Sequence, residues 1–218
     1  MTYSVRLMCN EDIAQAREID REVFYFQWPP PDFRRELESK LTRYIVICDT
    51  TKTAQIEPPV NSSLINRIKQ WLGRSGTTTD QSPAPRQDYI VGFAGIWVVA
   101  DESHLTNIAV RSEYQSRGIG ELLLTYSLEL AKELRAGFMT LEVRVSNTTA
   151  QNLYSKYGFT HKGLRKGYYH DNKEDAIIMS TESFNTASFQ RKLQKLKRDH
   201  ASRWGKDYAR NSIPLHPK

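Results

Sequence analysis

Residues 115–121, Gln-Ser-Arg-Gly-Ile-Gly-Glu, have the types and spacing needed to bind a phosphate group. They lie between an apolar, β-branched run that ends at Val110 and a Leu-rich stretch that begins at Leu122. A strand, a short loop and a helix start would bring unpartnered backbone N–H groups and the positive end of a helix dipole together. Gly118 and Gly120 carry no Cβ, so a diphosphate could approach the backbone closely, and Arg117 adds a positive charge. These residues indicate a phosphate-binding loop.

The same loop excludes two other kinds of phosphate site. No Lys-Ser or Lys-Thr pair follows the second glycine, as a nucleoside-triphosphate loop requires, and the three-glycine dinucleotide fingerprint is incomplete. An alternative stays open on these residues alone, namely a helix N-terminus whose glycines serve only close packing.

The elements that would position this loop alternate between strands and helices. Asn10 and Asp32 are suited to cap helices, Asn147 to open a later one, and Gly158 to stop it in a left-handed conformation. Expected strands cover 5–8 (at an edge of the sheet), 44–48, 89–99, 105–110 and 139–145, followed by an antiparallel pair within 159–169 and 175–179. Local hairpins mixed with strand–helix crossovers predict an α/β sheet that is only partly parallel.

Length and composition indicate one domain with appendages. The 218 residues include 39% hydrophobic and 11% aromatic side chains, enough for a core. No stretch approaches the roughly 20 apolar residues of a membrane span, and the N-terminus shows no apolar signal region. Cys9 and Cys48 match no metal-ligand spacing, which indicates reduced thiols. We therefore expect a cytoplasmic protein without a metal.

Two segments differ in composition from the rest of the chain. Residues 50–88 form an insertion rich in Thr, Ser, Pro, Gln and Gly around a short amphipathic helix at 64–72. That helix either docks on its own domain or binds a partner or a membrane surface. Residues 184–218 contain nine Lys or Arg and two Asp, and they form a basic tail that is helical or disordered. The tail is either a solvated appendage or an anchor for RNA or the ribosome.

Four blocks along the chain resemble the GCN5-related N-acetyltransferases (GNAT family). Residues 105–110 and 114–120 are similar to the acetyl-coenzyme A signature of that family, and 141–147 and 150–159 match the block that follows. The Glu-Val-Arg-x-Ser-Asn run, Tyr168-Tyr169 and residues 174–179 most resemble the bacterial ribosomal-protein-alanine N-acetyltransferases. The resemblance covers about 5–49 and 89–179, which makes 1–183 the acetyltransferase domain.

The resemblance implies an α/β GNAT fold, a mixed and mostly antiparallel sheet flanked by helices. Its central parallel strands, near Ile108 and Leu141, would splay apart around the pantetheine arm of acetyl-CoA. The cofactor-binding residues would be Ile108, Ala109, Val110, Gln115, Ser116, Arg117, Gly118, Ile119, Gly120, Glu121, Asn147 and Asn152.

The resemblance also implies direct acetyl transfer to a primary amine. Glu142 is the candidate general base, and it would work better if burial raised the pKa of its carboxyl. Tyr154 is the candidate general acid for the departing thiolate. Two alternatives stay open, since Glu142 could be a surface partner of Arg144 and Tyr154 a packing residue. His104, His161 and His170 are expected at the surface or in packing roles.

The implied acceptor is a protein N-terminus with a small first residue, for example on a ribosomal protein. Trp28, Tyr168 and Tyr169 would flank the acceptor groove. The sequence 24–29, Phe-Tyr-Phe-Gln-Trp-Pro, departs from the short Phe-Pro-Trp run more usual in the family. Acetylation of a lysine or of a small-molecule amine is the alternative activity, and a non-enzymatic CoA-binding sensor is the alternative class.

Overall fold

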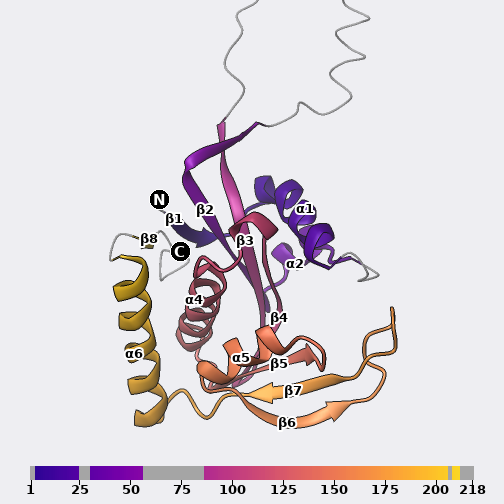
Figure 1. Ribbon diagram of the computed structural model, residues 1–218. Helices are drawn as coiled ribbons and strands as arrows, with labels where there is room; N and C mark the ends of the chain where they lie inside the picture. The colour runs from indigo at the N-terminus through magenta and orange to yellow at the C-terminus, as the bar shows by residue number, and fades with distance from the viewer. Residues whose placement is uncertain (1–2, 25–29, 56–85, 206–207, 212–218) are drawn as a thin grey trace, which may run out of the picture.

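The computed structural model describes residues 3–24, 30–55, 86–205 and 208–211 (Figure 1). In chain order the elements are β1 (Tyr3–Leu7), η1 (Asn10–Asp12), α1 (Ile13–Val23), α2 (Phe33–Glu38), β2 (Thr42–Gln55), β3 (Arg86–Val99), β4 (Glu102–Val110), η2 (Ser112–Tyr114), α4 (Ile119–Glu133), β5 (Phe138–Arg144), α5 (Thr148–Lys156), β6 (Thr160–Arg165), β7 (Ala176–Ser180), α6 (Ala187–Trp204) and β8 (Ala209–Asn211). Among the described residues, no helix is long and apolar enough to cross a membrane.

The strands form one mixed sheet in the order β6-β7-β5-β4-β3-β2-β1-β8. Neighbouring strands are antiparallel except β4 with β5 and β1 with β8. The predicted fold class, a mixed and mostly antiparallel sheet flanked by helices, is therefore confirmed. The expected edge position of the first strand is wrong, because β8 pairs in parallel with β1 and takes the edge beside it.

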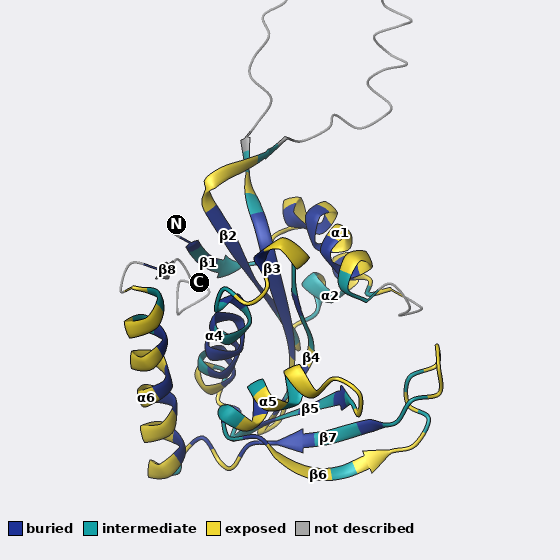
Figure 2. Ribbon diagram, in the orientation of Figure 1, coloured by how far each residue is buried: buried dark blue, intermediate teal, exposed yellow. Residues whose placement is uncertain are grey.

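Helices cover both faces of the sheet, and the two-residue period of the strands supplies a core to each face (Figure 2). On β2, Ile45 and Ile47 belong to the core beneath α4, α5 and α6. Their neighbours Tyr44, Val46 and Cys48 belong to the core beneath α1 and α2. Each face therefore buries its own set of side chains from the same strand.

The two central parallel strands separate soon after they meet. β4 pairs with β5 only over Glu102–Phe138, Ser103–Met139 and His104–Thr140. An extra residue, Thr106, interrupts the pairing of β4 with β3 just beyond that point, and such a bulge bends a strand and increases its twist. Among the residues that the structure describes, the remainder of β4, to Val110, pairs with β3 alone. The predicted splay is present.

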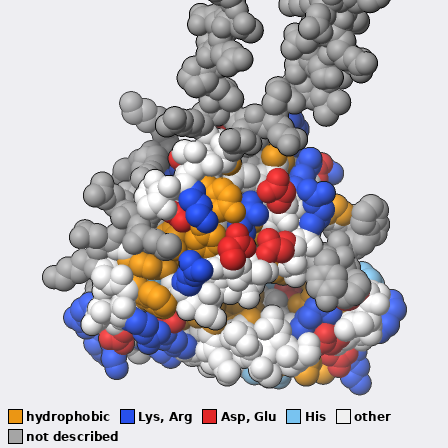
Figure 3. All heavy atoms as spheres, turned by 45° about the horizontal axis from the view of Figure 1, so that its top comes forward, with side chains coloured by type: hydrophobic (Ala, Val, Ile, Leu, Met, Phe, Trp, Pro, Cys, Tyr) orange, Lys and Arg blue, Asp and Glu red, His pale blue; other side chains and the backbone are white. Residues whose placement is uncertain are grey.

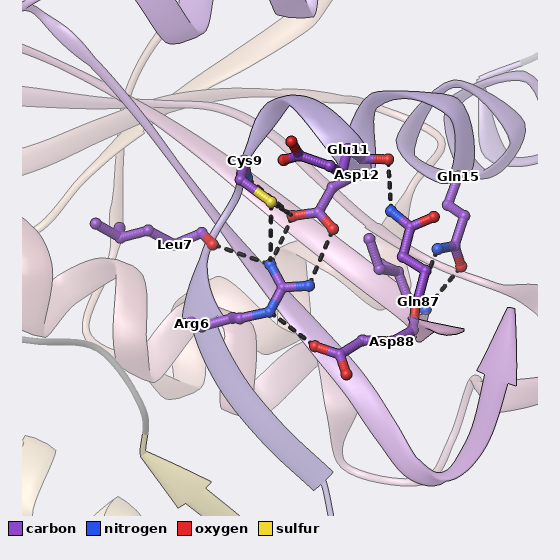
Figure 4. A network of polar contacts seen from close by, with 9 residues as sticks. Arg6, Leu7, Cys9, Glu11, Asp12, Gln15, Gln87 and Asp88 are labelled. Atoms are coloured by element: carbon purple, nitrogen blue, oxygen red, sulfur yellow. Dashed lines mark hydrogen bonds and ion pairs between the residues drawn. The ribbon is translucent and has the colours of Figure 1, made fainter. Parts of the chain in front are cut away.

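A polar network fastens α1 to the sheet (Figure 4). Arg6 of β1 binds the buried carboxylate of Asp12 with contacts of 2.6 and 2.9 Å, and it reaches Asp88 of β3 at 3.0 Å. Gln15 donates to the Asp88 carbonyl and accepts from the N–H of Ile90, both at 2.9 Å.

The first α-helix begins later than predicted. A 3-10 turn occupies residues 10–12, so the N-cap of α1 is Asp12 and not Asn10.

The C-terminal segment is packed against the domain. Phe189, Leu193 and Leu196 of α6 are buried in the same core as α4, and Tyr208 joins them. The tail was predicted to be helical or disordered, and its residues 187–204 form a helix. The boundary at 183 stays a prediction.

The insertion is partly strand. β2 continues to Gln55 and β3 begins at Arg86, so both strands extend into the predicted insertion at 50–88. The amphipathic helix predicted at 64–72 lies outside the described residues.

Candidate active site

A cleft of about 960 Å³ opens where β4 and β5 separate. Its walls come from both strands, the start of α5, the end of α1 and the loop between β6 and β7. Six predicted site residues line it, namely Ile108, Glu142, Asn147, Tyr154, Tyr168 and Tyr169. The fold therefore brings the candidate base, the candidate acid and two candidate acceptor residues to a single cavity.

Glu142 lies in the middle of β5 with its side chain only 8% exposed. Its Oε2 is 2.8 Å from His104 Nε2, and its Oε1 is 3.1 Å from an Arg165 guanidinium nitrogen. Burial alone would raise the pKa of this carboxyl, but the hydrogen bond and charge of His104 and the charge of Arg165 outweigh burial and lower it. A raised pKa, which would suit a base better, is not what this environment produces.

Arg144 shares the face of Glu142 on β5 but does not pair with it. Its guanidinium binds Asp171 at 2.9 Å and Glu174 at 3.1 Å, in the loop between β6 and β7. It also stacks on Tyr169, 3.8 Å from the ring centroid, and Tyr168 and Tyr169 meet edge to face. Arg144 therefore fixes the loop that carries both predicted acceptor residues, and the alternative of a Glu142–Arg144 surface pair is excluded.

Tyr154 projects from α5 and is 5% exposed. Asn147 caps this helix, because its Oδ1 accepts a hydrogen bond from the N–H of Ala150 at 3.1 Å. Burial and the neighbouring Tyr169 raise the pKa of the Tyr154 phenol. The phenol therefore keeps its proton at neutral pH, as a general acid must before it reacts.

The predicted phosphate loop begins α4 with two left-handed residues. Ser116 has φ +59° and Gly118, at the N-cap, has φ +79°. Successive N–H groups in such a turn form a concave anion site at the positive end of the helix. The loop therefore has the backbone geometry of a phosphate site, and its role in binding acetyl-CoA stays a prediction.

The C-terminal segment contacts this loop from outside. His200 Nε2 lies 3.1 Å from the Gly118 carbonyl, and the Tyr208 hydroxyl donates to the Arg117 carbonyl. A Cβ on Gly118 would lie 2.5 Å from Trp204 Nε1. Gly118 is thus required by its backbone conformation and by the indole packed against it.

The other predicted cofactor residues are more scattered. Ala109 is buried, Val110 is half-buried, and Asn152 is exposed on α5. Neither these three nor residues 115–121 line the cleft described above, so their contact with acetyl-CoA stays a prediction. Trp28 lies outside the described residues. In the part of the chain that the structure describes, no three His, Cys, Asp or Glu side chains group as a metal site.

Two sets of contacts were not predicted from the sequence. Glu142 is contacted by His104 and Arg165, and the phosphate loop is contacted by His200, Trp204 and Tyr208. His104 was expected at the surface or in packing, yet it binds Glu142 inside the cleft. The position of His104 next to the predicted strand 105–110 was the feature that could have indicated this contact, because that strand pairs in parallel with the strand that carries Glu142.

Comparison with known proteins shows the family of this chain. The acetyltransferase (GNAT) family model matches residues 49–159. A protein of Bacillus subtilis (strain 168), provisionally assigned as a ribosomal protein bS18-alanine N-acetyltransferase, is 35% identical over 177 residues, 81% of this chain and 93% of that protein. This chain belongs to the GNAT family and is an acetyl-CoA-dependent N-acetyltransferase.

Two solved structures show the same fold. The ribosomal-protein-S18-alanine N-acetyltransferase of Escherichia coli superposes with a TM-score of 0.60 at 24% identity, covering 85% of this chain and 96% of that one. A GNAT family acetyltransferase from Elizabethkingia anophelis, solved with acetyl-CoA bound, gives a TM-score of 0.54 at 17% identity, with coverages of 83% and 98%.

Proposed function

We propose that this enzyme acetylates the N-terminal α-amine of a protein whose first residue is small, such as the Ala or Ser of a ribosomal protein like bS18. The observation that carries the proposal is the cleft, where Glu142, Tyr154 and the Tyr168–Tyr169 pair line one cavity. The resemblance in sequence to a bS18-alanine N-acetyltransferase over 93% of that relative's length supports this acceptor class.

Acetyl-CoA supplies an acetyl group activated as a thioester. The residues of the loop at 115–121 would hold its diphosphate, and the open side of β4 near Ile108 and Val110 would hold its pantetheine arm. Ala109, Asn147 and Asn152 are the further candidates for binding it.

The reaction needs one group that removes a proton and one that supplies a proton. Glu142 takes a proton from the acceptor ammonium, so that the amine nitrogen gains a free electron pair for attack. As the nitrogen bonds to the acetyl carbon and the carbon–sulfur bond breaks, Tyr154 donates the proton of its phenol to the departing thiolate, and the second proton that the nitrogen loses restores the phenol. Both side chains are held in place, Glu142 by His104 and Arg165 and Tyr154 by burial on α5.

A panel of acetylation substrates tests the acceptor class. Peptides with a free α-amine, peptides with a blocked α-amine and a free lysine, and small amines separate the proposed activity from lysine and small-molecule acetylation. A chain that binds CoA and acetylates none of them would be a sensor.

We further propose that the exposed face of α6 binds RNA on the ribosome. Arg191, Lys192, Lys195 and Arg198 are exposed on that helix, and Figure 3 shows Lys and Arg side chains gathered over its position at the lower left. Nucleic-acid binding through several such cations falls steeply with salt. The opposite, apolar side of the helix is in the core, so deleting the helix would test folding and not binding.

The test of RNA binding must therefore remove charges from the exposed face of α6 and keep the helix. A variant with Lys195→Gln and Arg198→Gln is expected to sediment with ribosomes about tenfold less than the wild type at about 100 mM salt. Arg17→Gln with Arg21→Gln, the same charge change on exposed residues of α1, is the control and should leave association unchanged. Equal ribosome association of all three proteins, or association that does not respond to salt, would contradict an RNA anchor.

A further inference from the structure

Two backbone carbonyls at the start of α4 are contacted by side chains from the C-terminal part of the chain. The Tyr208 hydroxyl donates to the carbonyl of Arg117, and His200 Nε2 lies 3.1 Å from the carbonyl of Gly118. The partners are 91 and 82 positions apart in the sequence. Figure 1 shows the end of α6 and β8 beside the start of α4. Both contacts reach the backbone of the loop at 115–121, and the predicted role of that loop also depends on its backbone.

Each of these carbonyls determines where the N–H group of the following residue points. In a planar trans peptide the C=O and the next N–H point in opposite directions. A carbonyl of Arg117 directed at Tyr208 therefore turns the N–H of Gly118 away from the C-terminal part of the chain, and the carbonyl of Gly118 does the same for the N–H of Ile119. These N–H groups lie at the N-terminus of α4, where a helix leaves donors without intrahelical partners and anions bind.

The peptide between Arg117 and Gly118 is the one that depends most on such a contact. The carbonyl of Gly118 also accepts the first helical hydrogen bond, from the N–H of Leu122 at 3.0 Å, so α4 itself helps to orient it. The carbonyl of Arg117 precedes that bond. Gly118 has φ +79°, but a glycine adopts negative φ about as readily, so this peptide can turn over at little steric cost. Turned over, it would present the negative end of its dipole to a diphosphate.

Tyr208 is itself held firmly enough to orient this peptide. Its carbonyl accepts a hydrogen bond from the N–H of Tyr3 at 2.8 Å, next to the point where β8 pairs with β1. Its buried ring packs on Tyr3, with centroids 4.9 Å apart, and on His200, with centroids 5.3 Å apart. The hydroxyl is therefore presented to the loop by the sheet and by α6 together.

His200 can donate to Gly118 in its neutral form. Burial lowers the pKa of its imidazole, so the ring is uncharged at neutral pH and carries one proton. A carbonyl oxygen only accepts, so the proton must lie on Nε2 for the contact of 3.1 Å to be a hydrogen bond. His200 thus adds a second donor to a carbonyl that α4 already orients, and we expect its effect to be smaller than that of Tyr208.

We propose that Tyr208 and His200 are positioning residues for the acetyl donor, because they hold the first two peptides of α4 with their N–H groups directed toward its diphosphate. Each acts through a carbonyl on the outside of the loop, so neither is a catalytic residue. Their loss should therefore weaken the binding of acetyl-CoA and leave the transfer step unchanged. The inference rests on the proposed role of the loop at 115–121 in holding the diphosphate.

Tyr208→Phe tests the stronger of the two contacts, because it keeps the ring and removes only the hydroxyl. The Kd for acetyl-CoA, measured by calorimetry, should rise about five- to tenfold, the effect of one lost hydrogen bond. The kcat at saturating acetyl-CoA and the Tm should stay close to the wild type, which a general loosening of the fold would not allow. Tyr157→Phe, which removes a buried hydroxyl 3.1 Å from Thr125 Oγ1, is the matched control. An unchanged Kd in Tyr208→Phe, or an equal rise in the control, would overturn the proposal for Tyr208.

Two substitutions of His200 separate its hydrogen bond from its packing. Glutamine can place an amide N–H near the position of Nε2, whereas leucine fills similar space without a donor. We expect His200→Leu to raise the Kd for acetyl-CoA about two- to fivefold and His200→Gln to restore most of the affinity. Equal affinities in the two variants would show that His200 does not act through the Gly118 carbonyl.

An NMR measurement separates failure of this inference from failure of the diphosphate site. The amide signal of Gly118, in protein labelled with ¹⁵N-glycine and assigned from the Gly118→Ala spectrum, should shift when coenzyme A is added to the wild type. In free Tyr208→Phe it should be broadened by exchange between two peptide orientations. A wild-type signal that does not respond to coenzyme A would refute the loop as the diphosphate site. A wild-type signal that responds, together with wild-type affinity in Tyr208→Phe, would refute only the positioning role.

Discussion

Glu142→Gln is expected to lower kcat by about 10²- to 10⁴-fold while acetyl-CoA binds nearly as in the wild type. The substitution keeps the shape of the side chain, and an amide can still contact Arg165 and His104 at the positions that the carboxylate occupies. It removes the group that accepts the proton of the ammonium. Each tenfold loss corresponds to about 1.4 kcal/mol of transition-state stabilisation. Steady-state kinetics and calorimetry with acetyl-CoA measure the two quantities separately.

Tyr154→Phe tests the proposed general acid in the same way. We expect a loss near the lower end of the same range, about 10²-fold, because a thiolate is already a tolerable leaving group. The ring would still fill its buried site beside Phe159, so the fold should be kept. Glu129→Gln, which removes a carboxylate that pairs with Lys197 on the outside of α4, is the control and should turn over normally. Full activity in both Glu142→Gln and Tyr154→Phe would show that the two roles are wrongly assigned.

Gly118→Ala is expected to weaken acetyl-CoA binding tenfold or more. A left-handed conformation costs an alanine about 1–2 kcal/mol, and the added methyl group would lie 2.5 Å from Trp204 Nε1 and 3.0 Å from His200 Nε2. The loop must move to relieve the backbone strain and the two close contacts. Its N–H groups then leave the positions that would hold a diphosphate. A loss of 1.4 kcal/mol corresponds to a tenfold change in Kd, which calorimetry measures.

Gly205→Ala is the matched control for this variant. Gly205 has φ +96°, a positive value that strains an alanine as well, but no atom of the described residues lies within 4 Å of the added Cβ. We expect a small loss of stability and an unchanged Kd for acetyl-CoA. If Gly118→Ala bound acetyl-CoA as tightly as Gly205→Ala does, the loop at 115–121 would not be the diphosphate site.

Local patterns predicted the parts of the site that depend on local geometry. The glycine loop before α4, the Asn147 cap and the left-handed Gly158 follow from residue type and spacing, and the structure has all three. Alternation along β5 placed Glu142 and Arg144 on one face, as observed. The splay of β4 from β5 came from the family resemblance, because no pattern in either strand says where their pairing ends.

Contacts between distant segments could not be predicted in the same way. The His104–Glu142 pair depends on the parallel register of two strands, and no feature of either strand alone sets that register. The apolar stripe of Phe189, Leu193 and Leu196 was visible in the sequence, but a stripe does not say which surface covers it. Because that surface is the α4 side of the core, the segment treated as an appendage contacts the phosphate loop through His200 and Tyr208.

Mapping the acetyl group by mass spectrometry tests the central claim most directly. The enzyme is incubated with acetyl-CoA and two peptides of the same sequence, each beginning with alanine and containing one lysine, the first with a free α-amine and the second with that amine blocked. We predict one acetyl group on the α-amine of the first peptide and none on the second. Acetylation of the lysine in both peptides would contradict the proposed acceptor, and a wild-type enzyme that showed no coenzyme A binding in calorimetry would contradict the cofactor site.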